Sequence, residues 1–175
     1  SNPVALRKAF ETHGESLRQG LQNLLRDTRL GTVSMVERDA FTVGKNLATT
    51  PGKVVLRNRL LEVIHYTPTE AMNYANPIVI VTPWINKYYI LDLKPEKSLV
   101  KFLLDEGYSV FITSWKNPTA DMRDVAFEDY VTDGVGAIVN CARALSGGRD
   151  VHAVGYCIGG AALMTYTAWV NRRYA

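Results

Sequence analysis

The chain has 175 residues, a length that fits one ordinary domain better than two. With 47% hydrophobic and 21% charged residues it has the composition of an average globular protein, which excludes disordered, collagen-like and disulfide-scaffold classes. The net charge of +3 is spread along the chain without a block of like charges, so we expect no nucleic-acid partner.

The cysteine content and the hydropathy of the chain indicate in which cellular compartment the protein is located. The two cysteines, Cys141 and Cys157, show no spacing typical of a disulfide framework, which favours a reducing compartment. The most apolar run, residues 78–81, is far shorter than the roughly 20 residues of a membrane span, so we expect no transmembrane segment. The N-terminus lacks the apolar stretch of a secretory signal, and Ser1-Asn2 resembles the scar of a cleaved tag. These features predict a cytoplasmic protein.

The first 35 residues form a segment with its own pattern. Apolar residues recur at spacings of three and four between Pro3 and Leu30, as in an amphipathic helix that Gly14 divides. Such helices more often pack within a protein than bind a membrane or a partner. We therefore expect an N-terminal helical segment over residues 1–35 and a separate domain over residues 36–175.

The remainder alternates strand and helix patterns. Apolar runs predict buried strands at 77–82, 109–115 and 150–156, and helical spacing predicts helices at 96–106, 127–145 and 161–170. A weaker pattern at 60–66 predicts an antiparallel edge strand. This alternation is typical of a parallel sheet with helical crossovers, so the predicted fold class is α/β with a doubly wound sheet.

The most specific motif is Gly155-Tyr156-Cys157-Ile158-Gly159-Gly160, between a predicted strand and a predicted helix. It has the spacing of a nucleophile elbow, with Cys157 in place of the usual Ser, and glycines where strand and helix approach too closely for a Cβ. At the helix N-terminus the dipole favours a thiolate, which is an acyl acceptor. The alternative is a buried structural cysteine, since free Cys is a common core residue. We expect that role for Cys141, which has no flanking glycines.

An elbow nucleophile needs backbone N–H groups that bind the oxyanion, one from the next residue and one from the loop after the third strand. Ile158 is the first candidate. Ile85, in the loop that follows the strand at 77–82, is the second. The alternative for the aromatic residues of that loop, Trp84, Tyr88 and Tyr89, is that they cap a core, which aromatic side chains do more often than they line sites.

Three strings together make the chain resemble a known family: residues 82–93 (TPWINKYYILDL), 114–118 (SWKNP) and the elbow at 155–160. They closely resemble class I polyhydroxyalkanoate synthases, and the likeness extends from about Asp39 to about Trp169. The resemblance implies an α/β-hydrolase-like fold and an acyltransferase that polymerises (R)-3-hydroxyacyl-CoA into polyester with release of CoA. It also implies that Cys157 carries the growing chain as a thioester, without metal or redox cofactor, in a homodimer at the surface of storage granules.

The acid and the base of such a site are not found in this sequence. In this fold they follow the nucleophile in the order acid, histidine, yet no Asp or His follows Cys157. His152 lies five residues before Cys157, about 16 Å back along the same strand, and His13 and His65 are explained as surface or hydrogen-bonded core residues. We therefore expect the front part of a catalytic domain, truncated after the elbow helix, inactive alone, and with the strand at 150–156 left as an unpaired edge.

Two alternatives remain open. A cysteine α/β-hydrolase that cleaves a lactone or thioester with water shares the elbow but does not explain the string at 82–93. A non-catalytic fragment that docks on a partner through the helix at 3–30 requires Cys157 to be inert.

Overall fold

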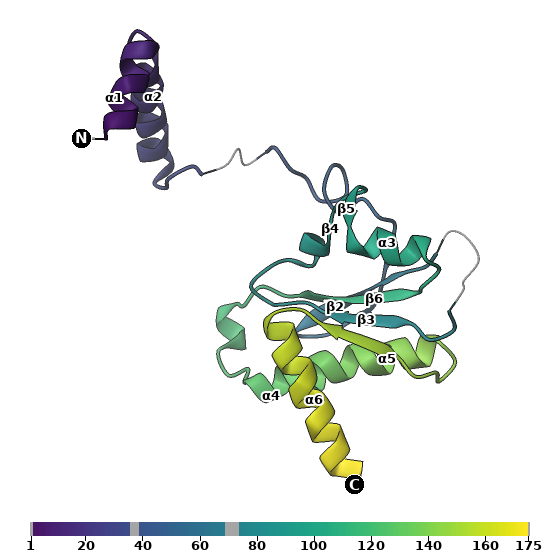
Figure 1. Cartoon of the computed structure of the whole chain (residues 1–175). Helices are drawn as coiled ribbons and strands as arrows, with labels where there is room; N and C mark the ends of the chain where they lie inside the picture. The colour runs from purple at the N-terminus through teal and green to yellow at the C-terminus, as the bar shows by residue number, and fades with distance from the viewer. Residues whose placement is uncertain (1, 36–38, 69–73, 175) are drawn as a thin grey trace. The chain divides into compact units, whose positions relative to one another are not determined.

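Two helices joined by a tight turn form the first of the two units into which the chain divides, residues 1–41 and 42–175 (Figure 1). The computed structural model describes residues 2–35, 39–68 and 74–174. Ser1, the predicted domain boundary at residue 36, and Ala175 lie outside the described residues.

The first unit confirms the predicted division at Gly14. Helix α1 (Pro3–Glu11) begins at Asn2, whose side chain accepts a hydrogen bond from the Val4 N–H, and α2 spans Glu15–Leu30. Gly14 lies between them with φ +88°, a left-handed conformation that glycine adopts without steric cost. No residue of either helix is buried, so both apolar stripes lie exposed within this unit.

A five-stranded mixed sheet in the order β1-β2-β6-β3-β7 forms the centre of the second unit. The neighbours β1, β2 and β6 are antiparallel, whereas β3 is parallel to both β6 and β7. The strands are β1 (Lys53–Arg57), β2 (Leu61–Tyr66), β3 (Ile78–Val81), β6 (Val110–Trp115) and β7 (His152–Gly155).

The predicted strands at 77–82, 109–115 and 150–156 are confirmed as β3, β6 and β7. The strand predicted at 60–66 is antiparallel as expected, but its placement at the edge is wrong, because β1 covers its outer side. Strand β1 escaped prediction because four of its five residues are exposed, so it lacks the apolar alternation of a half-buried strand. A two-stranded sheet, β4 (Asp92–Lys94) with β5 (Lys97–Ser98), was also missed.

The predicted helices are present with altered details. The helix expected at 96–106 is α3 (Leu99–Asp105), since its first residues form β5. The helix expected at 127–145 is continuous, but its middle is a π-helix: α4 (Phe127–Asp129), η3 (Tyr130–Gly136) and α5 (Ala137–Leu145). The elbow helix is α6 (Ile158–Tyr174), and two short 3₁₀ helices are η1 (Tyr88–Leu91) and η2 (Ala120–Met122).

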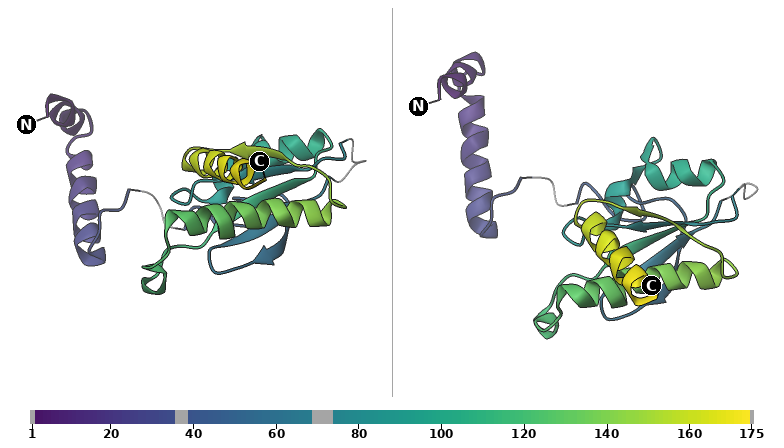
Figure 2. Two further views of the ribbon diagram at one scale, coloured as in Figure 1. Left: turned by 90° about the horizontal axis from the view of Figure 1, so that it is seen from below. Right: turned by 60° about the horizontal axis from the view of Figure 1, so that its bottom comes forward.

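Helices cover both faces of the sheet, with α3 on one face and α5 and α6 on the other (Figures 1 and 2). Because side chains alternate along each strand, the buried residues divide into two clusters. On β3, Val79 and Val81 belong to the cluster with α5, while Ile78 and Ile80 belong to the cluster with α3. The order of layers, helix, sheet, helix, is the one expected for an α/β protein.

Strand β7 lies at an edge of the sheet in the described residues, as expected. It is not buried, contrary to our expectation: its first three residues are exposed, and Val154 is 45% exposed. The reason is that β7 pairs along one side only, with β3. A row of unpaired N–H and C=O groups at such an edge is open to pairing with another strand.

The two-cluster core predicts that truncating a buried apolar side chain lowers the free energy of unfolding far more than truncating an exposed one. We expect Ile112→Ala, at a fully buried side chain of β6, to lower the free energy of unfolding by about 2–5 kcal/mol, because it removes contacts in the cluster with α3. The control Met164→Ala, at a side chain that is 73% exposed, should change it by less than about 0.5 kcal/mol. Denaturant unfolding followed by tryptophan fluorescence measures both, and equal effects would contradict this description of the core.

Candidate active site

The turn between β7 and α6 has the geometry that the glycine spacing predicted. Strand β7 ends at Gly155, and helix α6 begins at Ile158. Between them Cys157 has φ +56°, a left-handed conformation that is rare for a residue with a Cβ. The N–H of Tyr156 donates to the Val81 carbonyl oxygen at 3.0 Å, and the N–H of Gly160 to that of Cys157 at 2.9 Å. Backbone strain of this kind is characteristic of functional sites.

Gly155 and Gly159 are sterically required, and the space at Gly160 is tight. A Cβ on Gly155 would lie 2.5 Å from the Cα of Gly160, and one on Gly159 would overlap the Val81 carbonyl oxygen. A Cβ on Gly160 would lie 3.2 Å from the Gly155 oxygen. The helix therefore begins in direct contact with the ends of β7 and β3, and this contact places Cys157 at the carboxyl edge of the parallel strands.

The two cysteines have different surroundings. Cys157 is exposed, whereas Cys141 is half-buried on α5 and packs against the core cluster on that face, as predicted. Burial raises the pKa of the Cys141 thiol, because the charged thiolate loses its hydration there. Cys157 is therefore the more accessible of the two thiols.

The loop after β3, residues 82–87, begins beside this turn and is fixed at its start. Thr82 is buried, and its N–H donates to Oγ1 of Thr113 on β6 at 2.9 Å. Its own hydroxyl donates to the Thr113 carbonyl oxygen at 2.8 Å, and its carbonyl oxygen accepts a hydrogen bond from Nε1 of Trp115 at 2.7 Å. None of these three contacts was predicted, although two threonines and a tryptophan at the ends of adjacent strands are a visible signal.

The rest of the loop carries the second oxyanion candidate. Trp84 packs against the core with its ring centroid 4.8 Å from that of Tyr130, which confirms the interpretation as a core cap for this residue. Ile85 follows with its side chain 82% exposed. The Lys87 ammonium contacts Asn117 Oδ1 in the segment after β6, which joins two strings of the family resemblance.

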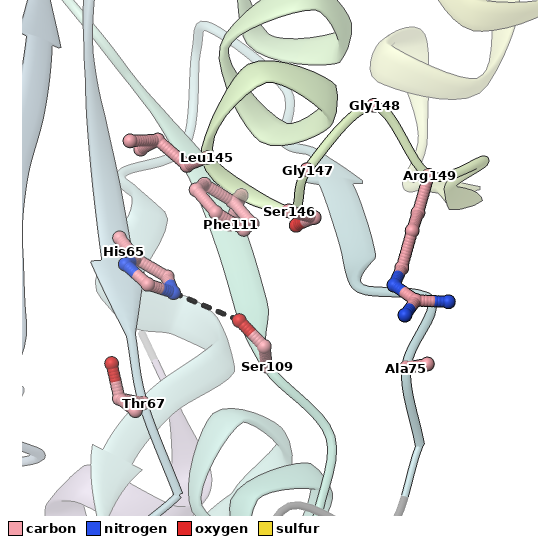
Figure 3. Close-up of a pocket in the computed structure, with 10 residues that line it drawn as sticks. All are labelled: His65, Thr67, Ala75, Ser109, Phe111, Leu145, Ser146, Gly147, Gly148 and Arg149. Carbon is pink, nitrogen blue, oxygen red and sulfur yellow. Dashed lines mark hydrogen bonds between the residues drawn. The ribbon is translucent and has the colours of Figure 1, made fainter.

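The histidines of the second unit lie away from the elbow. His152 is the first residue of β7, and Cys157 follows the other end of that strand. His65 on β2 is hydrogen-bonded from Nε2 to Ser109 Oγ at 2.8 Å and stacks on Phe111, and burial lowers its pKa. His65 and Ser109 line a cavity of about 640 Å³, together with Arg149 and seven other residues (Figure 3). The cavity lies at the amino end of β6, whereas Cys157 lies at the carboxyl ends of the parallel strands, so the two are at opposite ends of the strands.

Two further findings concern the parts of the chain that the structure describes, residues 2–35, 39–68 and 74–174. No three His, Cys, Asp or Glu side chains gather there in a way that could hold a metal ion. None of the described helices combines the length and the apolar character that crossing a bilayer demands.

Comparison with known proteins identifies the family. Residues 1–103 match the family described as "Poly-beta-hydroxybutyrate polymerase (PhaC) N-terminus". The chain belongs to this PhaC family. The match covers the β3 loop with Trp84 and Ile85, and it ends before the elbow.

The curated relatives extend the PhaC likeness through the elbow. The chain is 40% identical over 173 residues to the poly(3-hydroxyalkanoate) polymerase subunit PhaC of Cupriavidus necator, covering 99% of this chain and 29% of the relative. It is 41% identical to the poly(3-hydroxyalkanoate) polymerase of Methylorubrum extorquens, covering 97% and 29%. It is 44% identical to poly(3-hydroxyalkanoate) polymerase 1 of Ectopseudomonas oleovorans, covering 98% and 30%. The chain thus spans less than a third of these relatives.

The difference between the two thiols predicts selective alkylation. Brief treatment with iodoacetamide at neutral pH should modify Cys157 and leave Cys141 largely unmodified, because only Cys157 is exposed and only Cys141 has its thiolate disfavoured by burial. Mass spectrometry of tryptic peptides measures both sites. Preferential labelling of Cys141 would contradict the elbow assignment.

The close contact at Gly159 predicts a severe effect of a single methyl group. We expect Gly159→Ala to lower the free energy of unfolding by about 1–3 kcal/mol, because the added Cβ meets the backbone of β3 and cannot rotate away. Gly20→Ala on α2, where an added Cβ meets nothing within 4 Å, should leave the unfolding of residues 42–175 unchanged. Thermal unfolding of the two variants tests this, and a wild-type melting temperature for Gly159→Ala would refute the steric argument.

Proposed function

We propose that the chain is the front part of the catalytic domain of a class I polyhydroxyalkanoate synthase with an α/β-hydrolase-like fold, and that Cys157 is its nucleophile. The observation that carries this proposal is the left-handed, exposed Cys157 at the start of α6, flanked by Gly155 and Gly159, at which no Cβ fits. Family membership and the polymerase names of the relatives support the reaction class.

In the proposed reaction the Cys157 thiolate attacks the carbonyl carbon of an (R)-3-hydroxyacyl-CoA. The N–H groups of Ile158 and Ile85 receive the oxyanion, one from the residue after the nucleophile and one from the loop after β3. The tetrahedral intermediate collapses with cleavage of the C–S bond to CoA, which leaves as a thiol after taking a proton. The acyl group then remains on Cys157 as a thioester.

Chain growth requires a second step. The hydroxyl of another acyl unit loses its proton to a general base and attacks the thioester carbonyl, which forms an ester bond and releases the Cys157 sulfur. Neither His65 nor His152 lies at the elbow, so the base and its acidic partner are assigned to sequence beyond these 175 residues. The proposal includes a homodimer, a cytoplasmic location at the granule surface, and no cofactor beyond the CoA of the substrate.

Two other functions make different demands on the same residues. A hydrolase with the same elbow would release free hydroxy acid with CoA, whereas the synthase releases CoA and retains the acyl units as polymer. A docking fragment would not need the strain at Cys157 or the fixed loop after β3. Both observations favour the synthase or the hydrolase over the docking fragment, and family membership favours the synthase.

The assignment of Cys157 as the nucleophile predicts that replacing its sulfur atom by oxygen abolishes most of the activity. In the full-length polymerase that contains this chain, Cys157→Ser should lower kcat for CoA release at least about 10³-fold, because a serine hydroxyl is not ionised at neutral pH. Cys141→Ser should keep kcat within about twofold, since Cys141 lies in the core and not at the elbow. Thiol-release kinetics together with polymer recovery measure the outcome.

The same assay separates the alternatives. CoA release accompanied by polymer supports the synthase, and CoA release with an equal amount of free hydroxy acid would favour the hydrolase. An unchanged rate for Cys157→Ser would show that another residue carries the acyl chain.

A further inference from the structure

We propose that Trp115 is a positioning residue for acyl transfer: its indole N–H holds the Thr82 carbonyl, and thereby places the N–H of Ile85 toward the oxyanion that forms at Cys157. This inference rests on the proposed function, because it gives the β3 loop a role in the same reaction. Trp115 lies at the end of β6 and is not itself part of the elbow or of the loop.

The first step of the argument is the contact itself. Trp115 Nε1 donates to the Thr82 carbonyl oxygen at 2.7 Å, and both residues are buried. The N–H and the hydroxyl of Thr82 are already bound to Thr113. Thr82 is therefore held through all three of its polar groups at the point where the loop leaves β3. A buried network of this kind fixes one backbone conformation.

The second step is the rigidity of the indole ring. Trp115 is 8% exposed, and its ring packs against Gly134 on the π-helix η3. The contact is so close that a Cβ added to Gly134 would lie 2.6 Å from the ring. The Tyr130 ring, also on η3, lies 5.4 Å from it between centroids. The π-turn thus brings Tyr130 and Gly134 to the same indole, and π-helical turns are frequent at functional sites.

The third step joins the loop to the elbow. The ring of Trp84, the residue before Ile85, meets the Trp115 ring edge-on, with centroids 5.8 Å apart. On the other side, a Cβ on Gly159 would lie 2.9 Å from the Thr82 carbonyl oxygen, so the first turn of α6 packs against the atom that Trp115 binds. The Thr82 carbonyl group, at the start of the loop with Ile85, therefore contacts both the Trp115 indole and the first turn of the helix that begins at Ile158.

A Phe at this position would keep much of the ring packing and remove only the N–H donor. The Thr82 carbonyl would then lose its partner, and a shift of even about 1 Å in a group that stabilises a transition state costs up to about 10²-fold in rate. In the proposed reaction the Ile85 N–H binds the oxyanion, which develops in the transition state and is absent from the ground-state thioester. The defect should therefore appear in kcat and not in KM.

The test uses Trp115→Phe in the full-length polymerase. We expect kcat for CoA release to fall about 10- to 100-fold, with KM within about twofold. The rate of alkylation of Cys157 by iodoacetamide should stay within about twofold of wild type, because alkylation displaces iodide at a saturated carbon and forms no oxyanion. Gly134→Ala, whose methyl group would displace the indole, should show the same signature and serves as the second variant.

The control is Trp169→Phe on α6, which makes the same substitution at an indole whose ring contacts Tyr166 and Arg173 and not Thr82. It should leave kcat, KM and alkylation unchanged. Wild-type kcat in both Trp115→Phe and Gly134→Ala would overturn the inference. So would an equal loss of kcat and alkylation rate, which indicates a disturbed elbow and a structural role only. Because Cys157→Ser tests the nucleophile separately, a failure here leaves the proposed function standing.

Discussion

The site depends on how closely the start of α6 approaches the ends of β3 and β7. No Cβ fits at Gly155 or Gly159, and without this approach the chain could not turn from strand to helix within Tyr156 and Cys157. The turn forces Cys157 into the left-handed region, with a cost of about 1–3 kcal/mol that the surrounding packing must offset. Cys157 is exposed in this conformation.

The helices on the two faces of the sheet hold the strands that position the elbow and the loop after β3. Helices α5 and α6 share one core cluster with alternate residues of β3, and α3 covers the other face. The parallel arrangement of β6, β3 and β7 brings the loop after β3 and the elbow to one edge of the sheet. Hydrogen bonds of Thr82 to Thr113 and Trp115 then fix that loop, so the packing of the core and the geometry of the site share residues.

Much of this arrangement was predictable from the sequence because it follows from local rules. The glycines at 155, 159 and 160 indicated the turn, and the apolar runs indicated β3, β6 and β7. The burial of β7 was predicted wrongly, since its apolar residues give no sign of which side of the strand is paired. Strand β1 was missed because an exposed strand carries no alternating pattern, and the π-turn at Tyr130 because its spacing resembles that of an ordinary helix.

The contacts of Trp115 lay beyond sequence reasoning for a different reason. Its indole N–H donates to the backbone carbonyl oxygen of Thr82, 33 positions earlier in the chain, and no residue pattern encodes such a carbonyl partner. The resemblance drew attention to the strings at 82–93 and 114–118 without explaining why they occur together. The structure shows that they meet, through Trp115 with Thr82 and through Asn117 with Lys87.

The central claim is that Cys157 carries the acyl chain, and its most direct test is to find that chain. Full-length polymerase should be incubated with (R)-3-hydroxybutyryl-CoA, quenched in acid, digested with trypsin and analysed by mass spectrometry. Cleavage after Arg149 and Arg172 separates Cys157 from Cys141. We predict hydroxybutyryl units in thioester linkage on the peptide with Cys157, lost on treatment with hydroxylamine. Acyl units found only on another peptide would contradict the account.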